Sequence, residues 1–375
     1  MSAIETLLDF LAQPDAWCYH RGQEIASEPA ALAALALVGH GRLAAALKPL
    51  DWLVAHQQGT GQVALSASQQ DPGWTTAWAL LAWRAHDAAA LSPPSDSASP
   101  TRSPSAISST TAEQPAATTI VSTALPVRRP RASQGRYIDA IELGCRYLLS
   151  ISGLPLPRSP EMGHNTELIG WPWVIGTHSW LEPTCHAVLA LTACGRADHP
   201  RVQEGVRLLY DRLLPDGGAN YGNTIVLGQK LLAHLQPTGL VLLTLPPVTA
   251  AVTVPAREVT SGKPPQPSVP RVQAVSEASV SDGDQRLHRS ADFLLQHLKM
   301  DLPLASVAYA CLGLAAQRRM TAALAQQLRE RVDRELQTQP QTSTGFQPAL
   351  SLAALALLEE RCPLITLPAE GRYVE

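Results

Sequence analysis

The chain has 375 residues, 45% of them hydrophobic, which is enough to bury a sizeable core. Its 29 Lys and Arg residues nearly balance 32 Asp and Glu residues, with no long run of either sign, which excludes the basic surface typical of nucleic-acid-binding proteins. The six cysteines are scattered without a CxxC pair, and no apolar run approaches the roughly 20 residues of a transmembrane helix. We therefore expect a cytoplasmic protein with reduced thiols, which could still associate peripherally with a membrane.

Six apolar segments of one type follow a short amphipathic segment at residues 1–13. Each is predicted to form a helix that is buried on most sides, because its sequence leaves no polar face. A proline near the start of several of these segments suits the first turn of a helix, where its missing N–H would have no partner. The six segments are EPAALAALAL at Glu28, WTTAWALLAW at Trp74, EPTCHAVLAL at Glu182, QPTGLVLLTL at Gln236, LASVAYACLGL near Leu304 and QPALSLAALAL at Gln347.

Amphipathic segments lie between the apolar ones. Their apolar residues recur at intervals of three and four, as in Val202, Val206 and Leu209, which predicts helices with one buried face. These outer helices are expected at residues 40–57, 137–150, 200–214, 286–298 and 321–336. An inner apolar helix paired with an outer amphipathic one, six times over, predicts an all-α fold in a single domain, an (α/α)6 toroid.

Two segments differ from the rest of the chain in composition. Residues 92–135 are dominated by Ser, Thr, Pro and Ala, and residues 246–285 by Pro, Val and Ser. Neither segment has a periodic apolar face that could pack against the repeats. We therefore predict that both are long disordered insertions in loops of the toroid.

Four longer phrases carry a resemblance to a known family. They are LDWLVAHQQ, QQDPGWTTAWALLAW, GWPWVIGTHSWLEPTCHAVLAL and LLPDGGANYGN, which together with the inner segments cover about residues 30–91 and 137–245. These phrases resemble the repeats of the prenyltransferase and squalene cyclase superfamily, whose QW repeat is matched by Gln70, Gly73 and Trp74. The resemblance implies an α/α toroid that handles an isoprenoid or another hydrophobic ligand in its cavity.

The sequence departs from the acid motif of this family. In squalene–hopene cyclase-like enzymes a DxDD motif before an inner helix protonates an alkene, and the resemblance places Trp180, Leu181, Glu182 and Pro183 on its four positions. Only Glu182 keeps a carboxylate. Because burial of a single carboxyl in an apolar pocket raises its pKa and weakens it as an acid, polycyclisation by the usual route is not expected.

The zinc site of the protein prenyltransferases is also incomplete. The resemblance places Pro183 where that branch of the family has its zinc-binding histidine. Cys185 and His186 remain, but neighbouring residues on a helix point about 100° apart and do not readily bind one ion together. No metal or cofactor is therefore predicted, and zinc at Cys185 and His186 stays as the alternative.

Glu182 and His178 are the candidate catalytic residues. His178 lies between Thr177 and Ser179 in the loop before an inner helix, where it could act as an acid, a base or a polar anchor. Glu28, Gln236 and Gln347 occupy the place of Glu182 in other repeats. This repetition also favours a second interpretation of Glu182, in which the side chain fixes a helix end and does no chemistry.

The remaining candidates are polar and aromatic residues around the same helix starts. Tryptophan faces could stabilise a cation, although they could equally fill space between helices. Polar residues on the Gly-rich loop could satisfy backbone groups, and His164 is expected to be an ordinary hydrogen-bonded residue. The candidate ligand-binding residues are Trp171, Trp173, Trp180, Cys185, His186, Asp216, Asn220, Tyr221, Asn223 and Gln236.

Two classes of function remain open from the sequence. The first is an enzyme, or a degenerate enzyme, that acts on an isoprenoid inside the ring. The second is a non-catalytic toroid that holds a hydrophobic ligand, a peptide or a partner protein. A glycoside hydrolase is a more distant third, since it would require Asp216 and Glu182 to face each other as a carboxylate pair.

Overall fold

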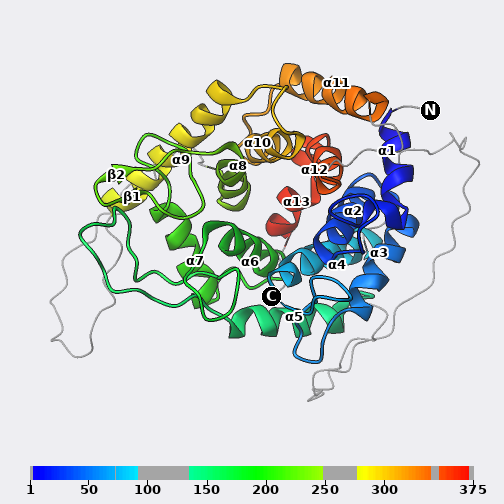
Figure 1. The fold of residues 1–375 in the computed structure, drawn as a ribbon, viewed down its shortest axis with the longest axis horizontal. Coiled ribbons are helices and arrows are strands. Elements are labelled where there is room, and N and C mark those ends of the chain that lie inside the picture. Colours follow the sequence, from blue (N-terminus) through cyan, green and yellow to red (C-terminus); the bar gives the residue numbers. More distant parts are fainter. Residues whose placement is uncertain (1–2, 72, 92–134, 248–276, 339–345, 371–375) are drawn as a thin grey trace, which may run out of the picture.

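The computed structural model describes residues 3–71, 73–91, 135–247, 277–338 and 346–370 (Figure 1). The described residues form thirteen α-helices, three short 3-10 helices and a single two-stranded sheet, which confirms the predicted all-α class. The sheet pairs β1 (Ile225–Val226) with β2 (Gln229–Lys230) in an antiparallel hairpin. No helix within these ranges is long and apolar enough to cross a bilayer.

The six apolar segments form six helices that contact one another in a closed order. Each helix packs against the next, and the last packs against the first (Figure 1). These inner helices are buried over nearly their whole length, as their apolar sequences predict. In chain order they are α2 (Ser27–Gly39), α4 (Thr76–Leu91), α6 (Leu181–Ala193), α8 (Leu235–Thr244), α10 (Leu304–Ala316) and α12 (Pro348–Ala356).

The amphipathic segments form the outer helices. Their bounds are α1 (Ala3–Leu11), α3 (Leu43–Ala55), α5 (Ile138–Ser150), α7 (Pro200–Asp211), α9 (Glu277–His297) and α11 (Ala322–Thr338). Helix α9 begins well before the expected residue 286, so the prediction of an insertion was wrong for residues 277–285. The chain has no proline between Pro270 and Pro303, so nothing interrupts the helix there. The rest of this insertion beyond residue 247, and residues 92–134 of the first, lie outside the described residues.

A threonine in the first turn of three successive inner helices fixes the loop that precedes it. The hydroxyls of Thr76, Thr184 and Thr238 accept hydrogen bonds from the backbone N–H groups of Val63, Trp171 and Ala219, at 2.9, 3.0 and 2.9 Å. All three hydroxyls are buried, so each bond satisfies a donor that water cannot reach. The loops before α4, α6 and α8 are therefore held in the same way at the amino-terminal ends of the inner helices.

A short helix after the last repeat was not predicted. Helix α13 (Pro363–Glu370) follows the 3-10 helix η4 (Glu359–Arg361) and contacts α2, α4 and α6 inside the circle of inner helices (Figure 1). Leu364 and Leu367 are buried there. Gly39, at the carboxyl end of α2, lies against Leu358 and Pro363, which places α13 at the carboxyl ends of the inner helices. The amino-terminal ends of the inner helices lie at the opposite end of the circle from α13.

Candidate functional site

Two buried carboxyl groups, from the first turns of α2 and α6, lie at the amino-terminal ends of the inner helices. Glu182 on α6 accepts a hydrogen bond of 3.4 Å from the Gln236 amide on α8. Burial chiefly raises the pKa of Glu28 on α2 and of Tyr309 on α10, and the charge of Glu182 raises both further, so these side chains lie within electrostatic range of Glu182. Since α2 and α6 are separated by α4 in the order of contacts, this cluster lies in the interior.

Burial is the main cause of the unusual acidity of both carboxyls. It raises the pKa of Glu182 to about 7, against a smaller lowering by the hydrogen bond from Gln236. It also raises the pKa of Glu28 to about 7, although the Tyr19 hydroxyl donates a 2.9 Å hydrogen bond to that carboxylate and lowers its pKa. At neutral pH this pair therefore holds a proton that it can give up or take back.

An aromatic cluster surrounds His186, one helical turn after Glu182 on α6, and its other members come from α4 and from the segments before α4 and α6. The His186 ring is 4.7 Å from Trp78, 6.1 Å from Trp74 and 6.2 Å from Trp173. Burial lowers the pKa of His186 to about 3, so its imidazole is neutral at physiological pH. Both nitrogens of His186 and the indole Nε1 of Trp78 are buried without a hydrogen-bond partner in the described structure.

A pocket of about 250 Å³ opens next to this cluster. Trp74 and Trp173 meet edge to face in its wall, with ring centroids 5.0 Å apart. Val174 and Ile175, which also line it, are 51% and 60% exposed and form an apolar rim. The lining residues are Asp71, Gly73, Trp74, Tyr147, Ile151, Pro172, Trp173, Val174 and Ile175.

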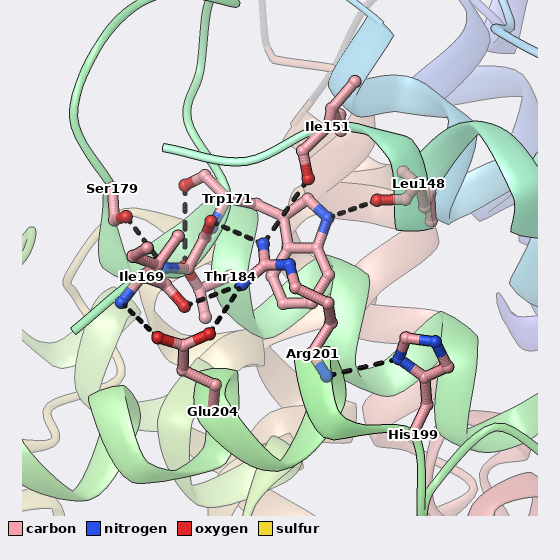
Figure 2. A network of polar contacts seen from close by, with 10 residues as sticks. Leu148, Ile151, Ile169, Trp171, Ser179, Thr184, His199, Arg201 and Glu204 are labelled. Carbon is pink, nitrogen blue, oxygen red and sulfur yellow. Dashed lines mark hydrogen bonds and ion pairs between the residues drawn. The ribbon is translucent and has the colours of Figure 1, made fainter. Parts of the chain in front are cut away.

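Trp171 is buried within a network of polar contacts and is not among the residues that line this pocket (Figure 2). Its indole N–H donates to the Leu148 carbonyl at 2.8 Å, and the Arg201 guanidinium lies 4.5 Å over its ring. Arg201 also donates to the carbonyls of Ile169 and Gly170, at 3.0 and 3.1 Å. These contacts tie the loop before α6 to α5 and α7, which favours the packing interpretation of this tryptophan.

His178 is not brought to the carboxyl pair. It is exposed, its ring lies 4.7 Å from that of the half-buried Trp180, and its backbone pairs with Leu154. Trp180 is the N-cap residue of α6 in an extended conformation and directs the chain into the helix that carries Glu182. Of the two candidate catalytic residues, His178 is therefore exposed to solvent and Glu182 is buried.

The Gly-rich loop faces solvent at several of its candidate residues. Asp216 is exposed and pairs with Lys230, and Tyr221 is exposed with its ring 5.3 Å from His234. Asn220 is buried, and its side-chain oxygen accepts the backbone N–H groups of Gly222 and Asn223 at 3.1 and 3.0 Å. This loop therefore stabilises itself, and the Asp216 and Glu182 pair required for a glycoside hydrolase is not formed.

Cys185 and His186 are poorly suited to bind a metal ion. Burial raises the pKa of the Cys185 thiol, which favours its uncharged form. No group of three or more His, Cys, Asp or Glu side chains able to hold a metal occurs in the described part of the chain. His164, expected to be an ordinary residue, is buried with Nδ1 3.3 Å from the Thr224 hydroxyl.

Sequence reasoning missed three contributors to the site. Glu28 was noted only as a repeat of Glu182, and Tyr309 and Trp78 were not considered. The signal for Glu28 was present, since it occupies the same place before a helix proline as Glu182. Trp78 and Tyr309 lie inside apolar phrases, where one more aromatic residue carries no separate signal.

No protein-family model matches the sequence, and no curated protein is significantly similar to it. The resemblance to the prenyltransferase and squalene cyclase superfamily therefore depends on the repeated phrases alone.

Proposed function

We infer that the chain is an α/α toroid of the prenyltransferase and squalene cyclase type, and that it binds a neutral, largely apolar ligand such as an isoprenoid alcohol. The closed order of contacts among the inner helices and the repeated phrases support this proposal. The ligand would lie at the amino-terminal ends of the inner helices, between the carboxyl pair and the aromatic cluster. The opposite end of the interior is occupied by α13.

The observation that carries this proposal is the carboxyl pair in an apolar interior. A carboxyl with a pKa of about 7 can exchange a proton with an oxygen atom of a ligand, but it is too weak to protonate an isolated alkene. The charged group that raises the pKa of Glu28 further is another carboxyl, Glu182, and negative charge of this kind disfavours an anionic diphosphate. A neutral ligand with a single polar end fits these charges best.

A second candidate function is a non-catalytic binding protein. Tyr19 donates a hydrogen bond to Glu28, and Gln236 donates one to Glu182. Carboxyls with a purely structural role, which hold neighbouring segments together, would make the same bonds. Under this interpretation the same ligand binds without being changed. The two candidates therefore differ in the chemistry of the pair and not in its location.

Native mass spectrometry and product analysis separate these functions. The full chain is incubated with farnesol, geranylgeraniol or squalene, beside the variants Glu28→Gln and Glu182→Gln, with Glu142→Gln at an exposed ion pair as the control. An enzyme converts a bound alcohol and loses turnover, but not binding, in either pair variant. A binding protein retains the ligand unchanged in every variant. Failure to bind any of the three compounds would contradict the proposal.

A further inference from the structure

We propose that the pocket bordered by Trp74, Trp173 and Tyr147 binds a small organic cation of the methylated ammonium class, with Asp71 as its counter-charge. Glu28 and Glu182 are not among the residues that line this pocket, and although Trp74 and Trp173 also belong to the aromatic cluster, binding of a cation here can be tested apart from the function proposed above.

The walls of the pocket present ring surfaces in different directions. Because Trp74 and Trp173 meet at 88°, their rings line the pocket in two planes, and Tyr147 adds a third aromatic side chain. A cation near the face of a tryptophan is attracted by the ring quadrupole, by about 0.5 to 2 kcal/mol depending on its exposure to water. Several rings around one small volume favour a cation over an anion.

The charge in the pocket is negative. Asp71 is the single charged residue among the nine that line it, and its Oδ1 accepts a 2.9 Å hydrogen bond from Gln62. Burial, and then the charge of Asp71, raise the pKa of Tyr147 to about 12, so the carboxylate and the phenol are close together. The Tyr147 hydroxyl is buried without a hydrogen-bond partner in the described structure, although the residue borders the pocket.

The volume and the apolar lining of the pocket indicate which class of cation it can bind. A volume of about 250 Å³ lies below the roughly 300 to 1,000 Å³ of pockets for drug-sized ligands, so the pocket suits a head group rather than a long chain. Ile151, Pro172, Val174 and Ile175 offer carbon surface and no acceptor side chain. Methyl groups on nitrogen fit such a surface, whereas a primary ammonium has three N–H donors, for which the lining side chains offer acceptors only on Asp71 and Tyr147.

Calorimetric titration of the full chain with choline and with 3,3-dimethylbutan-1-ol tests this assignment, because the second compound has the same shape without the charge. We expect choline to bind about 10-fold more tightly, which corresponds to about 1.4 kcal/mol. Asp71→Asn keeps an acceptor for Gln62 but removes the charge, and it should remove most of this preference.

Variants of the tryptophans complete the test. Trp173→Phe keeps an aromatic wall and should retain choline binding, whereas Trp173→Leu should lose it. Trp52→Phe, on α3 with its ring stacked on His56, should bind like the parent protein. The assignment is overturned if the neutral alcohol binds as tightly as choline, if choline shows no saturable binding, or if Asp71→Asn leaves the preference unchanged.

Discussion

The buried carboxyls make the stability of the protein depend on pH near neutrality. The pKa of Glu182 is about 7 in the folded protein and its ordinary value is 4.5, so between these values the unfolded chain loses a proton that the folded protein keeps. The free energy of unfolding therefore falls as pH rises from about 4.5 to 7, by about 3 kcal/mol for this group. Below about pH 4.5 the contribution of Glu182 to the free energy of unfolding is fully present, and above about pH 7 it has been lost.

Replacing Glu182 with Gln should flatten this dependence. The amide stays neutral at every pH, so the variant should be about as stable as the parent at pH 5 and more stable at pH 8. Glu28, His164 and His186 also have shifted pKa values, but they contribute equally to both proteins, so the stability difference between variant and parent should grow by about 2 to 3 kcal/mol from pH 5 to pH 8. Urea unfolding at pH 5, 6.5 and 8 measures this, with Glu142→Gln as a control that keeps the full slope. An unchanged slope in Glu182→Gln would refute the assignment.

Trp171 should behave as a structural residue. Trp171→Ala removes a buried indole, and we expect it to lower the free energy of unfolding by about 3 to 5 kcal/mol. Trp171→Phe keeps a ring beneath Arg201 but loses the hydrogen bond to Leu148, at a cost of about 1 kcal/mol. Trp52→Ala, at a half-buried position on α3, should cost less than Trp171→Ala. Equal losses at the two positions would contradict the packing interpretation.

Helices α8 and α10 approach each other through two glycines. A Cβ on Gly239 would lie 2.2 Å from the Tyr309 carbonyl oxygen, and one on Gly313 would lie 2.5 Å from the Gly239 carbonyl oxygen. Backbone atoms cannot move aside cheaply, so Gly239→Ala should force the helices apart and cost at least about 1 to 3 kcal/mol. Gly59→Ala, in open space, should change stability by less than about 0.5 kcal/mol. Thermal unfolding of both variants checks this, and a neutral Gly239→Ala would show that the helices are further apart.

Periodicity predicted the helices well because each inner segment is apolar all round and each outer one has a single apolar face. The two failures have separate physical causes. Helix α9 extends into residues 277–285 because, without a proline, their polar composition alone does not prevent a helix. Helix α13 is short and follows the last repeat, so its place inside the circle depends on tertiary contacts that no local pattern encodes.

At the scale of the whole molecule, helix α13 packs inside the circle of inner helices at their carboxyl ends. Leu364 is fully buried where α13 meets the inner helices, and Leu364→Ala should cost about 2 to 5 kcal/mol. Amide hydrogen exchange should then rise in α2, α4 and α6, which α13 contacts, and less in α8. The exposed Leu154→Ala serves as the control and should leave exchange in these helices unchanged. A uniform rise across all inner helices would contradict this placement.

The full set of residues that form the site could be identified only from the whole fold. Glu182 could be singled out from the sequence because a carboxylate stands alone at the start of an apolar helix. Its pairing with Glu28 could not, because it depends on which helices face each other across the interior. His178 and Asp216 were also candidates on local grounds, yet both are exposed, because the loops before the inner helices have a side that faces solvent as well as a buried side.

Titration of the two carboxyls by carbon-13 NMR tests the central claim most directly. Protein labelled at the glutamate carboxyl carbons is titrated from pH 4 to 9, and Glu28→Gln and Glu182→Gln assign the two signals. We expect both signals to titrate near pH 7, and we expect the loss of the charge at position 182 to lower the pKa of Glu28. Two carboxyls that titrate near 4.5, each indifferent to the other, would contradict it.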